Sequence, residues 1–389
     1  MPKVLHLLTA LGHGGAEIWL LNMLKELDRR ECEMDFCLKW AEAGKLEPQA
    51  LKAGAKVYHV PLRPSHIGYL QGLARIVREG RYDIVHSHEF IYSGLGVWVA
   101  RRLGVPVICT FHHWIYDPQT QLTRKPGIRH LRRAYGLLSV RYSLRRATYI
   151  TTLSKKAMSM VKPDPVLAPN YRILSLSTTI PPPPSEQARL ALRQAHGWSL
   201  GTPVVIHVGR FLEQKNHAGV LAVFERVRAE LPAAKLLLLG TGTLLEQVQK
   251  MVCAKGLEEH VRYLGLRDDV QALMGASDVF LFPSLEEGFG LAALEANAAG
   301  IPVVGSDIGG LDEAVVHGET AQLHPVSDLD GMAQSVLHFL RDRSYATQVG
   351  MAGRVRAQKH YSHAAAAQKL RTLYAECLSN PAGSTAWTR

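Results

Sequence analysis

Short apolar runs alternate along the chain with longer segments in which apolar residues recur at helical spacing. The runs KVLHLLTA, DIVHSH, PVICTFHH, YITTLS, PVVIHVG, AKLLLLG, VRYLG, DVFLFPS and PVVGSD are typical of strands buried on both faces of a parallel sheet. The segments 18–27, 217–230 and 244–255 have the pattern of amphipathic helices. Strands that alternate with helices predict βαβ units, and therefore an α/β fold with parallel sheets.

Four consecutive prolines in PPPPSEQARLALRQAHG predict an extended connector between two domains. We expect a doubly wound, Rossmann-like domain over residues 1–180 and a second one over residues 181–359. The helical segment 360–378 is predicted to pack back on the first domain, and residues 379–389 to form a flexible tail. Two such domains that face each other leave a cleft at the carboxyl ends of their strands, where these sheets bind ligands.

The composition narrows the class of protein. The chain has 389 residues, of which 47% are hydrophobic and 20% charged, as expected of a globular protein. Its five cysteines lack metal-ligand spacing, which favours reduced thiols in the cytoplasm. No stretch approaches the roughly 18 apolar residues of a membrane span. We therefore expect a cytoplasmic protein that is soluble, or at most peripheral on the inner face of a membrane.

The net charge of +11 is concentrated in the first half of the chain. Residues 1–180 carry 26 Lys and Arg against 13 Asp and Glu, and eleven basic residues with no acid lie between Asp117 and Asp164. The stretch from Arg124 to Lys162 is either a surface for an anionic lipid or acceptor, or a solvated helix face. No nucleic-acid-binding module accompanies the charge, so nucleic acid is not expected as a partner.

Two motifs in the second half carry candidate chemistry. HVGRFLEQKN places Arg210 and Lys215 just past a strand, where they either neutralise a diphosphate or are two solvated loop charges. SLEEGFGLAALEANAAG predicts a helix that begins near Gly290, whose unpaired N–H groups favour an anion. Glu287 and Glu295 stand on either side of that turn. Either they bind the sugars on the two sides of a diphosphate, or they are a carboxylate that stabilises the helix N-terminus and an ordinary surface glutamate.

The sequence from EEGFGLAALEANAAGIPVVGSDIGG to HGETAQLHP closely resembles the donor-binding motif of family 4 glycosyltransferases. VGRFLEQKN resembles the Gly-Arg…Lys element of that family, GHGGAE its N-terminal Gly-Gly loop, and DIVHSH its first-domain strand. The resemblance covers residues 3 to about 365. It implies the GT-B fold, in which two Rossmann-like domains face each other across a cleft, and retaining transfer from a nucleotide diphosphate sugar.

The resemblance also implies residue roles. Arg210 and Lys215 would bind the diphosphate and stabilise the leaving group, Glu287 would contact the donor sugar, and Glu295 would hold the ribose hydroxyls. His112, in CTFHHWIYD, would lie near the donor sugar, with the adjacent His113 as the alternative. The donor-binding residues that it implies are Gly14, Gly15, Gly240, Gly242, Arg267, Gly288, Phe289, Gly290, Leu291 and Glu295.

The resulting hypothesis is a glycosyltransferase that moves a sugar from a donor, most simply a UDP-sugar, to a hydroxyl of a glycan, lipid-linked intermediate or small natural product. The donor is a substrate, and no further cofactor is expected. No Asp-x-Asp motif lies near these elements, so we expect no metal, with cations and the helix terminus in its place. The alternatives are a nucleotide-sugar epimerase, a phosphorylase or sugar-phosphate synthase on the same fold, and a non-catalytic protein that binds a polyanion or a membrane.

Overall fold

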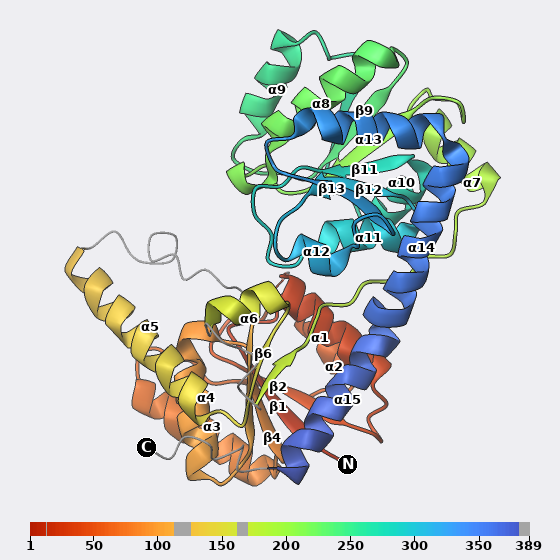
Figure 1. The fold of residues 1–389 in the computed structure, drawn as a ribbon. Coiled ribbons are helices and arrows are strands. Elements are labelled where there is room, and N and C mark those ends of the chain that lie inside the picture. The colour runs from red at the N-terminus through yellow and green to blue at the C-terminus, as the bar shows by residue number, and fades with distance from the viewer. Residues whose placement is uncertain (13, 113–125, 162–169, 381–389) are drawn as a thin grey trace. The chain divides into compact units, whose positions relative to one another are not determined.

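The computed structural model describes residues 1–12, 14–112, 126–161 and 170–380, and the chain folds as two compact units (Figure 1). Unit 1 contains Met1–Ser177 and the segment that begins at His363, and unit 2 contains Thr178–Ser362. Each unit is a twisted parallel sheet with helices on both faces. The predicted α/β fold of two doubly wound domains is therefore confirmed.

Unit 1 has a seven-stranded sheet in the order β3-β2-β1-β4-β5-β6-β7. Its strands are β1 (Lys3–Leu8), β2 (Glu33–Leu38), β3 (Val57–His59), β4 (Ile84–Ser87), β5 (Val107–Phe111), β6 (Tyr149–Thr152) and β7 (Tyr171–Ile173). Its helices are α1 (Gly15–Glu26), α2 (Glu47–Lys52), α3 (His66–Gly80), α4 (Ser93–Arg102), α5 (Pro126–Arg146), α6 (Lys155–Val161) and α15 (His363–Ser379). The chain moves from β1 to β2 on one side and later to β4 on the other, so the sheet has a switch point between β1 and β4.

Two apolar clusters cover the faces of this sheet. Helices α1, α2 and α15 pack on one face, and α3, α4 and α5 pack on the other. The C-terminal helix α15 contributes Leu370, Leu373 and Tyr374 to the first cluster, beside buried residues of β1 and β2. A segment more than 350 residues from the N-terminus thus completes the core of unit 1.

Unit 2 has a six-stranded sheet in the order β10-β9-β8-β11-β12-β13. Its strands are β8 (Val204–Val208), β9 (Lys235–Leu239), β10 (Val261–Gly265), β11 (Val279–Phe282), β12 (Val303–Ser306) and β13 (Ala321–His324). Its helices are α7 (Glu186–Gln194), α8 (His217–Glu230), α9 (Leu245–Ala254), α10 (Val270–Ala276), α11 (Leu291–Ala299), α12 (Leu311–Ala314), α13 (Leu329–Arg341) and α14 (Arg343–Tyr361). Here the switch point lies between β8 and β11.

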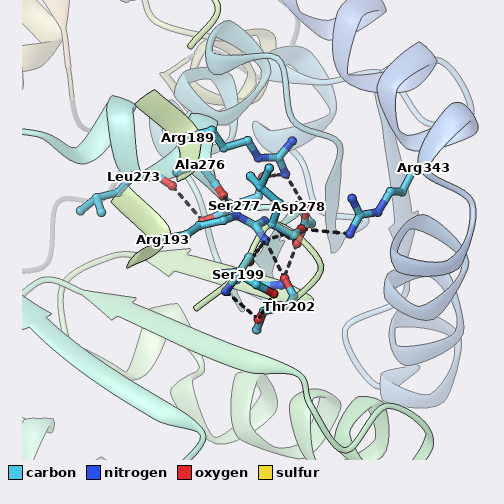
Figure 2. A network of polar contacts seen from close by, with 11 residues as sticks. Arg189, Arg193, Ser199, Thr202, Leu273, Ala276, Ser277, Asp278 and Arg343 are labelled. Atoms are coloured by element: carbon cyan, nitrogen blue, oxygen red, sulfur yellow. Dashed lines mark hydrogen bonds and ion pairs between the residues drawn. The ribbon is translucent and has the colours of Figure 1, made fainter. Parts of the chain in front are cut away.

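A buried arginine fixes α7 against the amino-terminal edge of this sheet (Figure 2). Arg193 is only 2% exposed and donates from Nη2 to Asp278 Oδ2 at 2.8 Å. Its Nε and Nη1 groups donate to backbone carbonyls, those of Ser199, Leu200, Thr202 and Ala276. Asp278 also accepts from Arg189 and from the backbone N–H of Val204. A buried guanidinium needs acceptors of this kind, because an unpaired buried charge is strongly destabilising.

Candidate active site

The two sequence motifs of unit 2 meet at the switch point of its sheet. HVGRFLEQKN follows β8, and SLEEGFG follows β11, the neighbouring strand. Backbone and side-chain hydrogen bonds join the two loops, since Leu285 N donates to Gln214 O at 2.8 Å and Asn216 Nδ2 donates to Pro283 O at 3.0 Å. Carboxyl ends of parallel strands at a switch point are the usual ligand site of such sheets.

An ion pair between the motifs is the central feature of this site. Lys215 Nζ lies 2.5 Å from Glu287 Oε1, and the two side chains are only 13% and 9% exposed. The ammonium group also lies 4.9 Å from the centroid of the Phe282 ring. Lys215 is therefore not a solvated loop charge. Arg210, from the same loop, is exposed at the surface of unit 2.

The turn before α11 presents backbone N–H groups. Gly290 is the N-cap residue, with φ at 78°, and it contributes no side-chain cap. The amides of the first turn are thus not capped by a side chain and form a site for an anion. Gly288 is partly buried, whereas Phe289 is buried with its ring centroid 5.5 Å from that of Tyr361. The helix begins at Leu291, as the spacing predicts.

Packing is a second reason why glycine occupies positions in and beside this turn. A Cβ on Gly290 would lie 2.7 Å from Leu311 Cδ1, and one on Gly310 would lie 2.6 Å from Glu287 O. Both glycines also have positive φ, which disfavours any other residue. The family resemblance implies that Gly290 binds the donor, and the structure adds that neighbouring loops leave no room for a side chain at Gly290 or at Gly310.

Glu295 lies one turn into α11 and is half-buried. Burial raises the pKa of its carboxyl from 4.5 to about 7. The group therefore changes charge near neutral pH. A ligand hydroxyl that donates a hydrogen bond to this carboxyl would stabilise its ionised form and so lower its pKa. Binding of such a ligand would therefore favour the carboxylate, which is the stronger acceptor.

The loops after β9 and β10 extend the edge of this site. Gly240 has φ at 128°, and a Cβ on it would collide with Gly209 O. A Cβ on Gly242 would likewise collide with Phe211 O. These two glycines let the loop after β9 run against the loop that carries Arg210. Arg267, after β10, is exposed and paired with Asp269 at 2.7 Å.

The predicted residues of unit 1 lie at the carboxyl edge of its own sheet. Gly14 and Gly15 are exposed at the start of α1, with Gly14 as the N-cap residue. His112 directly follows β5 and is partly buried, with Nε2 at 2.9 Å from Nδ1 of His88. His113 lies outside the described residues, as do Arg124, Lys125 and Lys162 of the basic stretch.

The hydrogen-bond partners of His112 could not be predicted from the sequence. His88, which is hydrogen-bonded to His112, is also hydrogen-bonded to His6 on β1. His6 is in turn hydrogen-bonded to the hydroxyl of Tyr374 on α15. Burial lowers the pKa of His6 to about 3 and the pKa of His86 and His88 well below the usual value. Only the tertiary structure brings them together, because Tyr374 is 286 residues from His88 in the sequence.

Three of these histidines also form a candidate metal-ligand set. Ring nitrogens of His6, His86 and His88 lie within 4.8 Å of one another, and this is the one such group found in the described part of the chain. Each ring already bonds through both nitrogens, to another ring or to the hydroxyls of Tyr374 and Thr110. A metal ion would have to replace those bonds.

In the same described part, no helix combines the length and the apolar character needed to cross a bilayer.

Comparisons with known proteins identify both halves of the chain. A family model described as glycosyl transferase 4-like domain matches residues 14–175, and one described as glycosyl transferases group 1 matches residues 188–356. These ranges contain nearly all of the residues discussed above.

Three individual proteins show how far the similarity extends. A GDP-mannose-dependent alpha-(1-6)-phosphatidylinositol monomannoside mannosyltransferase of Mycobacterium tuberculosis is 31% identical over 362 residues, which cover 88% of this chain and 89% of that protein. The N-acetyl-alpha-D-glucosaminyl L-malate synthase of Bacillus anthracis is 24% identical over 322 residues, or 81% of this chain and 80% of the relative. The crystal structure of HepE from Anabaena in complex with UDP aligns with a TM-score of 0.80, at 19% identity, over 97% of this chain and 100% of its own.

Proposed function

The chain belongs to the family of group 1 glycosyltransferases, and from its site we propose that it moves a sugar from a UDP-sugar to an acceptor hydroxyl with retention at the anomeric carbon. That it is a glycosyltransferase of the GT-B fold follows from the comparisons. The donor and the stereochemistry are our proposal. One observation carries the choice of site: Lys215 and Glu287 pair beside the uncapped N-terminus of α11, at the switch point of unit 2.

In this proposal the diphosphate of the donor binds against Lys215, Arg210 and the first turn of α11. Lys215 has three N–H donors and uses one on Glu287, so it can contact a phosphate oxygen while keeping the carboxylate. Negative charge grows on the diphosphate as its bond to the sugar breaks. Fixed cations and N–H groups stabilise that charge, and removal of one such donor typically costs about 10²–10³ in turnover. In this proposal these groups stabilise the negative charge that a metal ion neutralises in other sites.

The remaining predicted residues bind the two ends of the donor. Glu287 accepts a hydrogen bond from a sugar hydroxyl, Glu295 accepts from the ribose, and His112 contacts the sugar. Gly240, Gly242 and the backbone near Arg267 line the base. The support for uridine is the HepE fold, whose crystals hold UDP or UDP-glucose, whereas the mycobacterial relative has GDP-mannose in its name.

Retention follows if the acceptor attacks on the face from which the diphosphate leaves. The bond from the anomeric carbon to the phosphate oxygen breaks, and a bond to the acceptor oxygen forms. The acceptor's hydroxyl proton passes to the departing phosphate oxygen, so no protein nucleophile is needed. An NMR spectrum of the product shows the anomeric configuration, and inversion would contradict this step.

A panel of UDP-, GDP- and ADP-sugars tests the proposal, scored by nucleotide release and by thermal shift. We expect a UDP-sugar to stabilise the chain and to be turned over, with Lys215→Ala reducing turnover by about 10²–10³. Lys250→Ala is the matched control, because Lys250 is exposed on α9 and belongs to neither loop. Binding of another nucleotide sugar would overturn the choice of uridine. Equal turnover by the two variants would overturn the site.

A product screen separates transfer from the other reactions of this fold. With donor alone, an epimerase converts one nucleotide sugar into another, whereas a transferase releases nucleotide slowly by hydrolysis. Added phosphate or sugar phosphate stimulates a phosphorylase or a synthase. We expect stimulation by hydroxyl acceptors and activity that is unchanged after chelation of divalent metals.

We further propose that α5 brings the enzyme to an anionic membrane surface, which would supply a lipid-linked acceptor. Leu137 and Leu138 are 49% and 66% exposed on this helix. The exposed basic residues of its described part are Arg133, Arg141, Arg145 and Arg146. Apolar side chains among exposed cations are typical of helices that lie on anionic lipid.

Vesicle sedimentation tests this contact. The chain should bind vesicles that contain phosphatidylglycerol and not those of phosphatidylcholine alone, and the double variant Leu137→Ser/Leu138→Ser should lose most of the binding. Leu266→Ser is the control, since Leu266 is 81% exposed on unit 2. Equal binding by the double variant and the control would contradict the role of α5.

A further inference from the structure

One continuous chain of hydrogen bonds crosses the switch point of the unit 1 sheet. His6 Nδ1 lies 3.0 Å from His88 Nε2, and His88 Nδ1 lies 2.9 Å from His112 Nε2. The hydroxyl of Tyr374 lies 3.3 Å from His6 Nε2 and 3.1 Å from His86 Nδ1. His86 Nε2 lies 2.7 Å from Thr110 Oγ1, which lies 2.5 Å from Thr151 Oγ1. In order, the chain is Thr151, Thr110, His86, Tyr374, His6, His88 and His112.

Each residue of this hydrogen-bonded series has only one proton that it can donate to its neighbours. His6, His86 and the two threonines are fully buried, and burial keeps the interior rings neutral, with the pKa of His6 lowered to about 3. A neutral imidazole has one N–H and one bare nitrogen, so a ring that bonds through both nitrogens donates on one side and accepts on the other. A hydroxyl has one proton as well. If it accepted from both neighbours, that proton would be left buried without an acceptor, at the cost of its desolvation.

These limits couple all the bonds. If Tyr374 donates to His6, then His6 donates from Nδ1 to His88, and His88 donates from Nδ1 to His112. On the other side of Tyr374, His86 must donate from Nδ1. Reversing one bond reverses all the others. The four histidines therefore share one tautomer, with the proton either on every Nδ1 or on every Nε2.

The Thr151 end decides between the two directions. Among the residues that the structure describes, Thr151 Oγ1 has Thr110 as its hydrogen-bond partner and no other. If the proton were on every Nε2, Thr110 would donate to Thr151, and the hydroxyl proton of Thr151 would have no acceptor. With the proton on every Nδ1, Thr151 donates to Thr110 and leaves only lone pairs unfilled. Buried orphan donors are rarer in proteins than under-used acceptor oxygens, so the second arrangement is favoured.

We propose that this chain is a tautomer relay that fixes the proton of His112 on Nδ1, with His88, His6 and Tyr374 as positioning residues for His112. His112 then presents Nδ1–H as a hydrogen-bond donor, and its Nε2 is held as an acceptor for His88. That this donor acts on the sugar of the nucleotide sugar rests on the proposed function. The tautomer itself does not.

Imidazole ¹⁵N spectra of the full-length chain, labelled in histidine and free of donor, test the relay directly. Protonated and bare ring nitrogens resonate far apart, and single His→Gln variants at positions 6, 86, 88 and 112 assign the signals. We expect all four rings to be neutral at pH 7.5, with the proton on Nδ1. A single ring of this set with its proton on Nε2, or one that is doubly protonated, would overturn the relay.

Two variants at position 88 separate hydrogen bonding from packing. His88→Leu removes both hydrogen bonds, so His112 should show a mixture of the two tautomers and turnover should fall by roughly 10- to 100-fold, as when partners that orient a ligating histidine are lost. His88→Gln can accept from His6 and donate to His112, and it should restore the Nδ1–H signal of His112 and much of the turnover. Equal spectra of His112 in these two variants would contradict the relay.

Tyr82→Phe is the control for the loss of a buried hydrogen bond elsewhere in unit 1, because Tyr82 donates to Asp35 at 2.7 Å and lies outside the relay. It should leave the His112 spectrum and turnover unchanged. Should His112→Ala retain full turnover while the wild-type spectrum shows Nδ1–H throughout, the proposed role of His112 fails and the relay stands. A divalent metal that co-purifies in equal amount, and whose removal by a chelator changes the spectra of His6, His86 and His88, would overturn the relay in favour of a metal site.

Discussion

Replacement of Glu295 by Gln tests whether burial controls the charge of the donor site. Burial raises the pKa of the Glu295 carboxyl from 4.5 to about 7. Unfolding exposes the group to water and returns its pKa to the usual value, so the folded protein binds this proton more tightly. The stability linked to Glu295 is therefore fully present below about pH 4.5 and is lost as the pH rises to about 7.

The magnitude follows from the size of this change. A tenfold change in proton affinity is worth about 1.4 kcal/mol, so ionisation of Glu295 costs the folded state at most roughly 3–4 kcal/mol at pH 8. The side chain is half-buried, and solvent that reaches it reduces the cost. Gln keeps the size of the side chain and removes the charge. We expect Glu295→Gln to be more stable than the wild type by roughly 1–3 kcal/mol at pH 8, with the difference vanishing near pH 4.5.

Urea unfolding of both proteins at several pH values between 5 and 8 measures this difference. Glu246→Gln is the control, because Glu246 is exposed on α9 and should give a difference near zero at every pH. A difference for Glu295→Gln that does not grow with pH would refute the reasoning. Calorimetry adds a functional readout. UDP affinity should rise more steeply between pH 6 and 8 in the wild type than in Glu295→Gln, since the ionised carboxylate accepts the ribose hydroxyls, whereas ionisation of the terminal phosphate of UDP affects both proteins alike.

Three further predictions follow from single contacts. Lys215→Ala leaves the carboxylate of Glu287 buried without its partner, so it should lower the unfolding free energy by roughly 3 kcal/mol as well as turnover. The double variant Lys215→Ala/Glu287→Gln should recover stability but not turnover, and recovery of both would contradict the site. Gly290→Ala should destabilise unit 2 by about 1–3 kcal/mol more than Gly300→Ala, because both positions have positive φ but only the first has a neighbouring atom within 3 Å of the new Cβ. Equal melting temperatures would refute that comparison. Arg193→Lys should cost about 3 kcal/mol, because an ammonium group cannot reach the carbonyls that the guanidinium satisfies, and an unchanged urea midpoint would contradict this.

Local features of the fold could be predicted because their causes are local. The helix predicted over residues 217–230 is α8, which spans His217–Glu230. The helix predicted to begin near Gly290 does so, since a glycine with positive φ ends the loop and begins the helix. Alternation of apolar runs with amphipathic segments was enough to predict two doubly wound sheets.

The candidate site was predictable only in part. Arg210, Lys215, Glu287 and Glu295 were selected by their motifs, and their roles toward a donor stay predictions. The ion pair of Lys215 with Glu287 was not foreseen, because 72 residues separate the two and only the pairing order of β8 and β11 brings their loops together. The sequence places the charges along the chain, and the strand order decides which of them meet.

The histidines of unit 1 show most clearly which contacts the sequence alone does not predict. By itself the sequence determined that His86, His88 and His112 stand at the ends of predicted strands, because strand periodicity is a local property. Only the tertiary structure decided that His6 lies beside His86 across the β1–β4 pair and that Tyr374, on the last helix, bonds both. Such contacts depend on the order in which strands pair and on the face where α15 packs. These are long-range choices that the fold makes as a whole.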